Sequence, residues 1–252
     1  MSFDFDQLVV DDVSRHFGRR KALNRVTLAC AAGEVVGLLG PNGAGKSTLL
    51  SILSTLVAPS TGQVRYGDRT ARQAGPALRA RLGLLGHDLY LYPELTAREN
   101  LQFFARLFGL PQTSDVVGDA LTRANLADRA DDVVSGFSRG MRQRLALERA
   151  LLHQPRLLLL DEPFTGLDDA SGQALVARLK GLRDRGCIVI IATHDLDLAE
   201  GLFDRLAVLR DGRLLPVAES SASLRDRYRD TIQAAAAGAS ASRGRHGQGG
   251  AS

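Results

Sequence analysis

The sequence has 252 residues, of which 44% are hydrophobic and 24% are charged, and its formal net charge is +4. These values are ordinary for a soluble globular protein, and the length fits one α/β domain with an insertion or two small domains. A solvated basic face explains so small a charge, which gives no argument for nucleic acid as a partner. No run approaches the 18 apolar residues of a membrane span, and the acidic N-terminus does not resemble a signal peptide. We therefore expect a cytoplasmic protein that reaches a membrane only through a partner.

The first third of the chain combines β-like segments with a glycine-rich loop. Residues 8–13 and 25–30 predict an antiparallel sheet, which leads into a short buried strand at 34–39. Residues 48–53 are typical of the first turns of a helix. Between that strand and that helix lies the pattern G-x-x-x-x-G-K-S/T, which is typical of a phosphate-binding loop in this context.

The loop predicts how a nucleotide would be held. Glycines let successive N–H groups point inward, and the helix N-terminus adds its positive dipole end. We expect Lys46 to reach the β- and γ-phosphates, as a catalytic residue, and the Ser47 hydroxyl to bind Mg²⁺. The alternative is a glycine-rich turn with no ligand. The loop residues are Gly40, Pro41, Asn42, Gly43, Ala44, Gly45, Lys46, Ser47 and Thr48.

The middle of the chain predicts an all-helical insertion. After a short strand at 81–86, Thr96 and Glu99 have the spacing of a capping box that starts a helix. A second amphipathic helix is expected at about 115–125. No strand is apparent between residues 88 and 136. We therefore expect a helical insertion within an α/β core.

Strands return in the last third. Residues 156–161 and 187–193 are continuous apolar runs, typical of a parallel sheet that is buried on both faces. Residues 206–210 and 213–217 predict a hairpin around the dipeptide Asp-Gly. Residues 233–252 are rich in Ala, Gly, Ser and Arg, and we expect them to be a disordered tail. The two cysteines, at positions 30 and 187, lie in apolar stretches and predict buried free thiols.

Two acidic residues, Asp161 and Glu162, directly follow the four leucines at 157–160. We expect Asp161 to hold Mg²⁺ through water near Ser47, and Glu162 to act as the general base for the attacking water. The alternative is an ordinary strand end with two solvated carboxylates. The preceding phosphate loop, at a domain-sized distance, favours the catalytic interpretation.

The segment 135–144 carries a further motif. It resembles the signature of ATP-binding cassette (ABC) proteins, usually Leu-Ser-Gly-Gly-Gln: Phe137, Ser138 and Gly140 match, whereas Arg139 and Met141 depart from the pattern. Ser138 is also placed to cap a helix over residues 139–152, whose N-terminus could face a phosphate. By itself an ordinary capped helix would explain this segment.

The order of the motifs identifies the ABC family. The motifs follow one another in the order that the family shows, and the resemblance covers residues 7–217. They are the phosphate loop, the helical stretch, the signature, the acidic strand, a segment like the family's D-loop that ends at Asp168, and His194. The resemblance implies that Phe17 stacks on adenine and that His194 contacts the γ-phosphate. Phe17 could instead pack in the core, and His194 could cap a helix beside Asp195.

The resemblance also implies fold and assembly. The expected fold is α/β, a P-loop NTPase of the ABC nucleotide-binding type with an antiparallel β subdomain and an α-helical insertion. The domain would cover residues 7–232, with its helical subdomain at about 88–152. Two copies would pair head to tail, so that Ser138 and Gly140 of one close over ATP held by Lys46 of the other. A separately encoded transmembrane permease would hold the homodimer at the cytoplasmic side of the membrane, as a peripheral protein.

His87 stands where the family's Q-loop has glutamine. The following run Leu-Tyr-Pro-Glu-Leu, residues 91–95, sets that alignment. An imidazole can bind Mg²⁺ or hydrogen-bond water, but its charge changes near neutral pH. We therefore expect hydrolysis to depend on pH through His87.

The finer resemblance concerns cargo. Gly-His at 86–87 and Asp-Glu-Pro-Phe-Thr at 161–165 look like the haem-exporter subunits of cytochrome c maturation, so haem export is the first expectation. Asp-Glu-Pro-Phe-Thr also recurs in other transporter subunits, and the segment at 137–143 also occurs in drug or polysaccharide export subunits. Export of a drug, lipid or polysaccharide is therefore the alternative. Soluble ABC ATPases of DNA repair or translation usually carry two cassettes, long coiled-coil arms or zinc-binding cysteines, none of which appear in this sequence. Another P-loop kinase or GTPase would not explain Ser138, Gly140 and His194 in this order.

Overall fold

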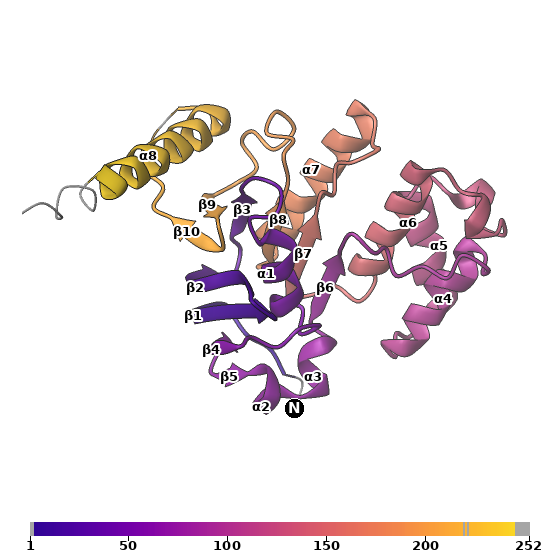
Figure 1. Ribbon diagram of the computed structural model, residues 1–252. Helices are drawn as coiled ribbons and strands as arrows, with labels where there is room; N and C mark the ends of the chain where they lie inside the picture. The colour runs from indigo at the N-terminus through magenta and orange to yellow at the C-terminus, as the bar shows by residue number, and fades with distance from the viewer. Residues whose placement is uncertain (1–2, 219, 221, 245–252) are drawn as a thin grey trace, which may run out of the picture.

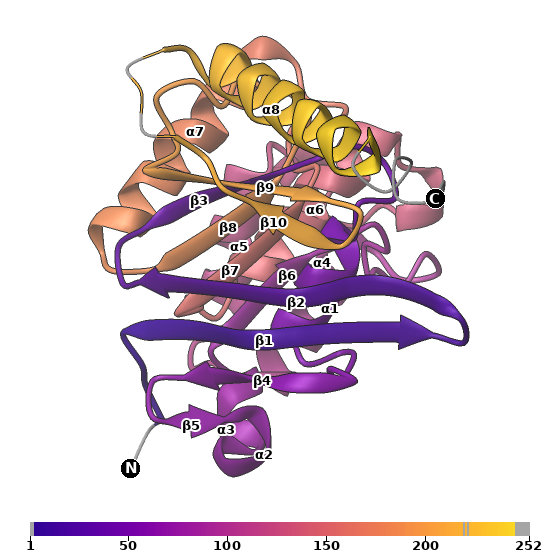
Figure 2. The ribbon, with the colours of Figure 1, turned by 60° about the vertical axis from the view of Figure 1, so that its left-hand side comes forward.

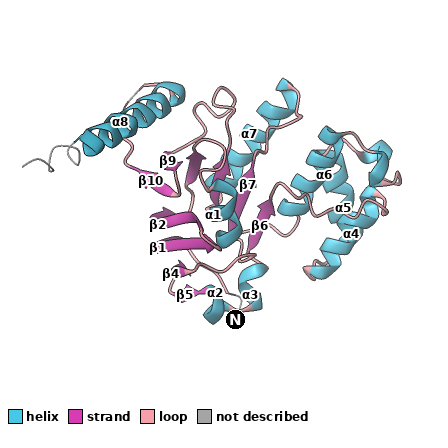
Figure 3. Cartoon of the chain, in the orientation of Figure 1, coloured by secondary structure: helices cyan, strands magenta, loops and turns pink. Residues whose placement is uncertain are grey.

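The computed structural model describes residues 3–218, 220 and 222–244, which form two sheets and a set of helices (Figures 1 and 3). The smaller sheet is antiparallel, in the order β2-β1-β4-β5. The predicted antiparallel sheet is therefore confirmed, although its first two strands are longer than expected and its last two were not predicted. Its strands are β1 (Gln7–Phe17), β2 (Arg20–Ala31), β4 (Thr61–Tyr66) and β5 (Arg69–Thr70).

The larger sheet positions the phosphate loop and the acidic pair. Its order is β10-β9-β3-β8-β7-β6, and its neighbouring strands are parallel except for the β9–β10 hairpin. Because parallel strands end at one edge, the loop after β3 and the carboxylates at the end of β7 lie at the same edge, with β8 between them. The strands are β3 (Val35–Leu39), β6 (Leu82–Leu85), β7 (Leu157–Asp161), β8 (Ile188–Ala192), β9 (Arg205–Arg210) and β10 (Arg213–Leu215).

Both faces of the larger sheet are buried, as its continuous apolar strands predict. Alternate residues point to opposite faces, so Leu157 and Leu159 join one core and Leu158 and Leu160 the other. On the first face, α1 (Lys46–Leu53) packs between this sheet and the smaller one. On the second face lie α6, α7 and α8, with α8 crossing above β9 and β10 in Figure 2. These helices are α6 (Arg139–Leu151), α7 (Asp169–Asp184) and α8 (Leu224–Gly244).

The helical insertion has a core of its own. Thr96 and Glu99 form both hydrogen bonds of the predicted capping box at the start of α4. Residues 88–136 contain no strand, and their one β-bridge joins Thr96 to Val133. Leu145 of α6 packs in this core while Leu147 packs against the sheet, so α6 belongs to both parts. The other elements are α4 (Ala97–Leu107), α5 (Thr113–Arg123), and the 3-10 turns η1 (Ala127–Arg129) and η2 (Val134–Gly136).

A buried carboxylate ties the insertion to α7. Glu148 of α6 is 2% exposed and accepts hydrogen bonds from Arg123 of α5 at 3.1 Å and Arg178 of α7 at 3.0 Å. A buried carboxylate needs such partners, because an unpaired charge in the interior costs several kcal/mol. The two guanidinium groups therefore hold α5, α6 and α7 together.

Several elements differ from the sequence-based expectation. The short helices α2 (Ala71–Ala74) and α3 (Pro76–Arg79) and the long α7 were not predicted. Residues 233–244 belong to α8 and not to a disordered tail, while 245–252 lie outside the described residues. The start of α8 is held by its Leu224 N–H, which donates to Glu200 at 3.0 Å. Alanine-rich sequence favours a helix once one end packs on the domain.

The predicted hairpin turn and the two buried thiols are confirmed by the structure. Asp211 and Gly212 have φ values of +48° and +74°, as a tight hairpin turn requires, and β10 ends two residues earlier than expected. Cys30 and Cys187 are free and buried, and burial raises the pKa of each thiol to about 12. None of the described helices has the length and apolar character needed to cross a bilayer.

Candidate nucleotide-binding site

Backbone contacts on two sides fix the shape of the phosphate loop. Gly40 has φ of +150°, and a Cβ on it would lie 2.1 Å from the Leu209 carbonyl oxygen. Gly45 has φ of +110°, and a Cβ there would lie 2.6 Å from the Ala22 carbonyl oxygen. Only glycine fits positions that combine a positive φ with so close an approach. The loop is therefore held between β2 and the β9–β10 hairpin.

Lys46 is the first residue of α1 and folds over its own loop. Its Nζ donates to the Gly40 carbonyl at 2.6 Å and to the Pro41 carbonyl at 3.3 Å. Gly45 gives the helix no side-chain cap. A helix start of this kind leaves N–H groups for an anion, with the positive dipole end behind them. The ammonium group and the helix start therefore make a phosphate site.

A cavity of about 330 Å³ opens over this loop. It brings Phe17, His87, Asp161 and Glu162 together with the loop, although these residues lie far apart in the sequence. The cavity thus brings together residues to which the motifs assign roles at one nucleotide site. Three loop residues, Gly40, Pro41 and Ala44, do not line the cavity. Its lining residues are Phe17, Arg20, Ala22, Asn42, Gly43, Gly45, Lys46, Ser47, Thr48, His87, Asp161 and Glu162.

Glu162 and His194 form a pair at the cavity edge. The His194 Nδ1 lies 2.8 Å from the Glu162 Oε2, and the His194 backbone N–H donates to the same oxygen at 3.3 Å. Glu162 has φ of +51°, and its own N–H donates to the Ala192 carbonyl at 2.7 Å. The His194 side chain is 82% exposed. The carboxylate is thus held on one side while the imidazole stays open to a ligand.

The donors near the loop suit Mg²⁺ bound with a nucleotide. Ser47, Asp161 and His87 line one cavity. Among the described residues, no three His, Cys, Asp or Glu side chains are placed to hold a metal by themselves. Mg²⁺ prefers oxygen ligands and is usually bound through one or two carboxylates and substrate phosphates. The hydroxyl and carboxylate fit that pattern, and His87 would add a nitrogen.

Three predicted residues lie elsewhere. Ser138 caps α6, where its Oγ accepts from the Met141 N–H at 3.3 Å. Asp168 caps α7, and the hydrogen bond from the Ser171 N–H holds the pKa of its carboxyl below the usual range. A Cβ on Gly140 would lie 2.6 Å from the Gly166 carbonyl oxygen, so the signature packs against the D-loop. None of the three lines the cavity of its own chain.

Comparison with known proteins decides the family. Residues 23–165, more than half of the chain, match the family described as ABC transporter. The chain belongs to this family. It carries the family's ATPase domain, and the fold described above is the one that the motifs predict.

Two relatives in the ABC family show how far the likeness extends. The Nod factor export ATP-binding protein I of Bradyrhizobium diazoefficiens is 41% identical over 79% of this chain and 66% of its own length. The linearmycin resistance ATP-binding protein LnrL of Bacillus subtilis is 32% identical over 83% of this chain and 68% of its own. The chain thus spans about two thirds of each relative. Neither name mentions haem, so the haem-export expectation gains no support.

A solved structure supports the same family. The ATP-binding cassette MJ0796, solved as a dimer in a post-hydrolysis state bound to ADP and Pi, superposes with a TM-score of 0.76. It is 28% identical and covers 82% of this chain and 96% of its own length. The likeness therefore extends over nearly a whole ABC cassette.

The structure adds Arg20 to the cavity lining, which the motifs did not indicate. Arg20 begins β2, and its Nη2 lies 3.8 Å from where a Cβ on Gly43 would stand. It forms no ion pair with a described residue. Nearby, the Arg15 guanidinium lies 4.6 Å from the centre of the Phe17 ring, which is 48% exposed. A Phe-Gly turn followed by basic residues, at 17–21, was the signal available in the sequence.

We expect Arg20→Ala to raise the Kd of ATP about three- to tenfold, because a solvent-exposed guanidinium–phosphate contact is worth about 1 kcal/mol. Adenosine should bind both proteins equally, since it has no phosphate. Arg19→Ala is the matched control, because Arg19 is exposed and does not line the cavity. Isothermal titration calorimetry measures all of these affinities. Equal losses for the two variants, or an equal loss for adenosine, would exclude a phosphate contact at Arg20.

Proposed function

We propose that this chain binds MgATP at the cavity over its phosphate loop and hydrolyses it to drive an export transporter. The main support is that one cavity is lined by four groups that this reaction needs. They are the ammonium group of Lys46, the Ser47 hydroxyl and Asp161 carboxylate suited to Mg²⁺, and the Glu162 carboxylate. Proximity of these groups is what phosphoryl transfer requires, since its catalysis is largely positioning and charge stabilisation. Release of phosphate from MgATP by the purified protein tests this. A folded protein that releases none, at any concentration and with its membrane partner, would overturn the proposal.

Each group would act on a different part of ATP. Adenine stacks on Phe17, whose ring lies at the cavity wall. Lys46 exchanges its two carbonyl partners for phosphate oxygens. Glu162 takes the proton of the attacking water, and His194, held on the same carboxylate, contacts the γ-phosphate. Ser47, Asp161 and His87 would hold Mg²⁺, which would supply positive charge beside the phosphates.

The active form in this proposal is a head-to-tail homodimer. Ser138, Gly140 and Asp168 do not line the nucleotide cavity of their own chain. Residues that complete the site of a second copy are expected to lie outside the cavity of their own chain. The Ser138-capped N-terminus of α6 would then face the γ-phosphate held by the other copy. The MJ0796 cassette, solved as a dimer bound to ADP and Pi, supports a dimeric active form.

The partner would be a separately encoded transmembrane permease, which places the dimer peripherally at the cytoplasmic side of the membrane. An apolar groove of about 420 Å³ runs between the helical insertion and the sheet. Tyr90 and Tyr92 line it and are half-exposed, and Tyr90 lies three residues after His87. An exposed aromatic groove of this kind is typical of a protein interface. A permease segment seated there would contact the segment that carries His87.

The cargo is proposed from the relatives. Nod factor export and linearmycin resistance, the functions in their names, favour an exporter of Nod-factor-like or drug-like molecules over a haem exporter. The test is co-purification with the membrane partner, followed by accumulation of candidate compounds in cells without this chain. Loss of c-type cytochromes in those cells, with unchanged drug sensitivity, would contradict the proposal.

His87 gives the proposed site a pH dependence that can be separated from that of His194. A protonated imidazole neither binds Mg²⁺ nor accepts a hydrogen bond from water, so turnover should fall as the pH drops. We expect His87→Gln to retain several-fold more of its pH 8 turnover at pH 5.5 than the unaltered protein does. His194 is present in both proteins, so the difference between their pH–rate profiles reports His87. Superimposable profiles would show that His87 plays no such part.

A further inference from the structure

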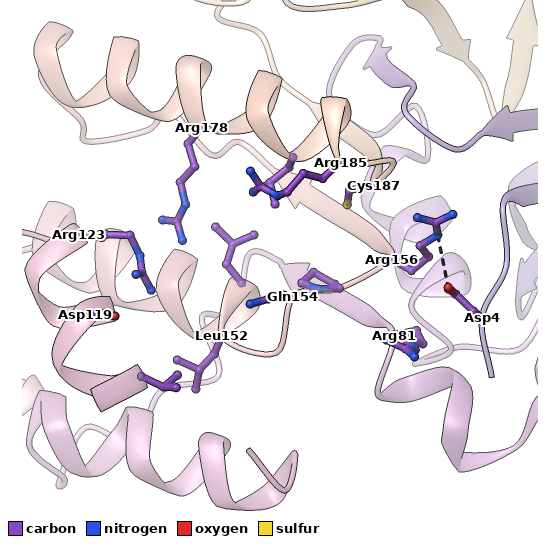
Figure 4. Close-up of a pocket in the computed structure, with 14 residues that line it drawn as sticks. Asp4, Arg81, Asp119, Arg123, Leu152, Gln154, Arg156, Arg178, Arg185 and Cys187 are labelled. Atoms are coloured by element: carbon purple, nitrogen blue, oxygen red, sulfur yellow. Dashed lines mark ion pairs between the residues drawn. The ribbon is translucent and has the colours of Figure 1, made fainter. Parts of the chain in front are cut away.

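A second cavity, of about 680 Å³, is shown close up in Figure 4. It lies at the opposite end of the larger sheet from the phosphate loop. Arg81, Arg156 and Cys187 line it and directly precede β6, β7 and β8. Those three strands are parallel, so their starts share one edge, whereas the phosphate loop follows the end of β3. The nucleotide site and this cavity therefore share no lining residue.

Five arginines line this cavity and two aspartates oppose them. They come from separate parts of the chain, and Figure 4 shows Arg123 and Arg178 on one side and Arg81 and Arg156 on the other. Helix α5 also contributes Asp119. So many guanidinium groups around one hollow repel one another unless an anion lies between them. The five are Arg81, Arg123, Arg156, Arg178 and Arg185.

Internal partners leave much of this positive charge uncompensated. Arg123 and Arg178 share the one carboxylate of Glu148. Arg156 lies 3.5 Å from Asp4 and donates its Nε to the Phe5 carbonyl at 2.7 Å. Arg185 is exposed and forms no ion pair with any residue that the structure describes. Arg81 donates its Nε to the Phe3 carbonyl at 2.9 Å. Each guanidinium has five N–H donors, so Arg156 and Arg185 keep donors available to a ligand.

The floor of the cavity is apolar. Arginine forks match phosphate oxygens in pairs, and apolar side chains cover an organic body. A volume of about 680 Å³ is in the range of small-molecule sites. The floor residues are Val116, Leu151, Leu152, Pro155 and Leu182.

We propose that this arginine-lined cavity binds a phosphate-bearing organic anion, with Arg185 and Arg156 contacting phosphate and the apolar floor contacting the organic part. Val116 and Arg123 belong to α5 of the helical insertion, whereas Leu182 and Arg185 belong to the end of α7. The ligand thus touches both the insertion and the α/β core. A soluble phosphate ester and a phospholipid headgroup share this chemistry.

The test measures binding with the nucleotide site already filled, so it does not depend on the proposed ATPase cycle. The protein is saturated with MgADP and titrated with fructose 1,6-bisphosphate in a calorimeter. A parallel arm measures sedimentation with phosphatidylcholine vesicles that do or do not contain phosphatidic acid. Arg185→Gln should weaken binding about tenfold, the loss expected for a phosphate contact. Arg213→Gln is the control, because Arg213 is an exposed arginine on β10, outside the cavity.

The experiment distinguishes a soluble ligand, a lipid headgroup and general attraction to a basic protein. Loss of bisphosphate binding in Arg185→Gln but not in Arg213→Gln supports a soluble ligand, and the same pattern with phosphatidic acid supports a headgroup. Equal effects of the two variants show only general attraction to a basic protein and overturn the proposal. Absence of saturable binding in both arms overturns it too. Matching melting temperatures of the three proteins confirm that each is folded.

Discussion

Lys46→Ala should lower the affinity for ATP about tenfold or more and turnover at least about a hundredfold. The ammonium group is the one cation that α1 places at its own N-terminus, and its two carbonyl partners show where a phosphate oxygen would lie. A hydrogen bond to a charged group is worth about 1.5 to 3 kcal/mol. Loss of a donor that stabilises charge in a transition state costs about 100- to 1000-fold in rate. Calorimetry and phosphate release measure the two effects.

Lys180→Ala is the matched control for this change. Lys180 lies on α7 and does not line the cavity over the phosphate loop, so both affinity and turnover should stay within about twofold of the unaltered protein. Lys46→Arg adds a second check, since a guanidinium keeps the charge but not the shape. Normal turnover in Lys46→Ala would exclude the phosphate-loop mechanism.

Glu162→Gln should bind ATP normally, lose turnover by about 100- to 10,000-fold, and accumulate as a dimer. The amide keeps the size of the carboxylate and its carbonyl oxygen still accepts from His194, but it cannot take a proton from water. With hydrolysis blocked, ATP remains between the two copies and holds them together. Size-exclusion chromatography with and without ATP follows the dimer, and phosphate release follows turnover.

The control for Glu162→Gln is Glu94→Gln. Glu94 is exposed and lies outside the cavity, and the change removes the same charge. It should leave turnover and the monomer–dimer equilibrium unchanged. If Glu162→Gln hydrolyses ATP at the original rate, another group is the general base. If it binds ATP but stays monomeric at all concentrations, the head-to-tail homodimer is wrong.

The features that the sequence predicts correctly are those formed within one short segment of the chain. The phosphate loop needs glycines at positions where φ is positive and neighbours approach closely, and Gly40 and Gly45 meet both conditions. The capping box of α4 and the Asp211–Gly212 turn are likewise closed by residues within three positions of each other. Such local hydrogen bonds leave a pattern that can be read directly.

The elements that sequence reasoning missed lack such a pattern. In β4 only Val64 and Tyr66 are buried, so the segment is too short for a clear alternation. Helix α7 follows the D-loop with a recognisable Asp168 cap, yet its alanines and arginines give a weak apolar stripe. Residues 233–244 were assigned to a disordered tail for their composition, which does not show that α8 is anchored near its start.

The sequence by itself determined the phosphate loop, the acidic pair after β7 and the order of motifs that marks the family. Only the tertiary structure placed His194 on Glu162, Arg20 beside Gly43, and Arg185 at the arginine-lined cavity. The physical reason is the order of strands in the larger sheet, which puts β8 between β3 and β7. Pairing between distant strands depends on the packing of the whole core, and no short stretch of residues records it.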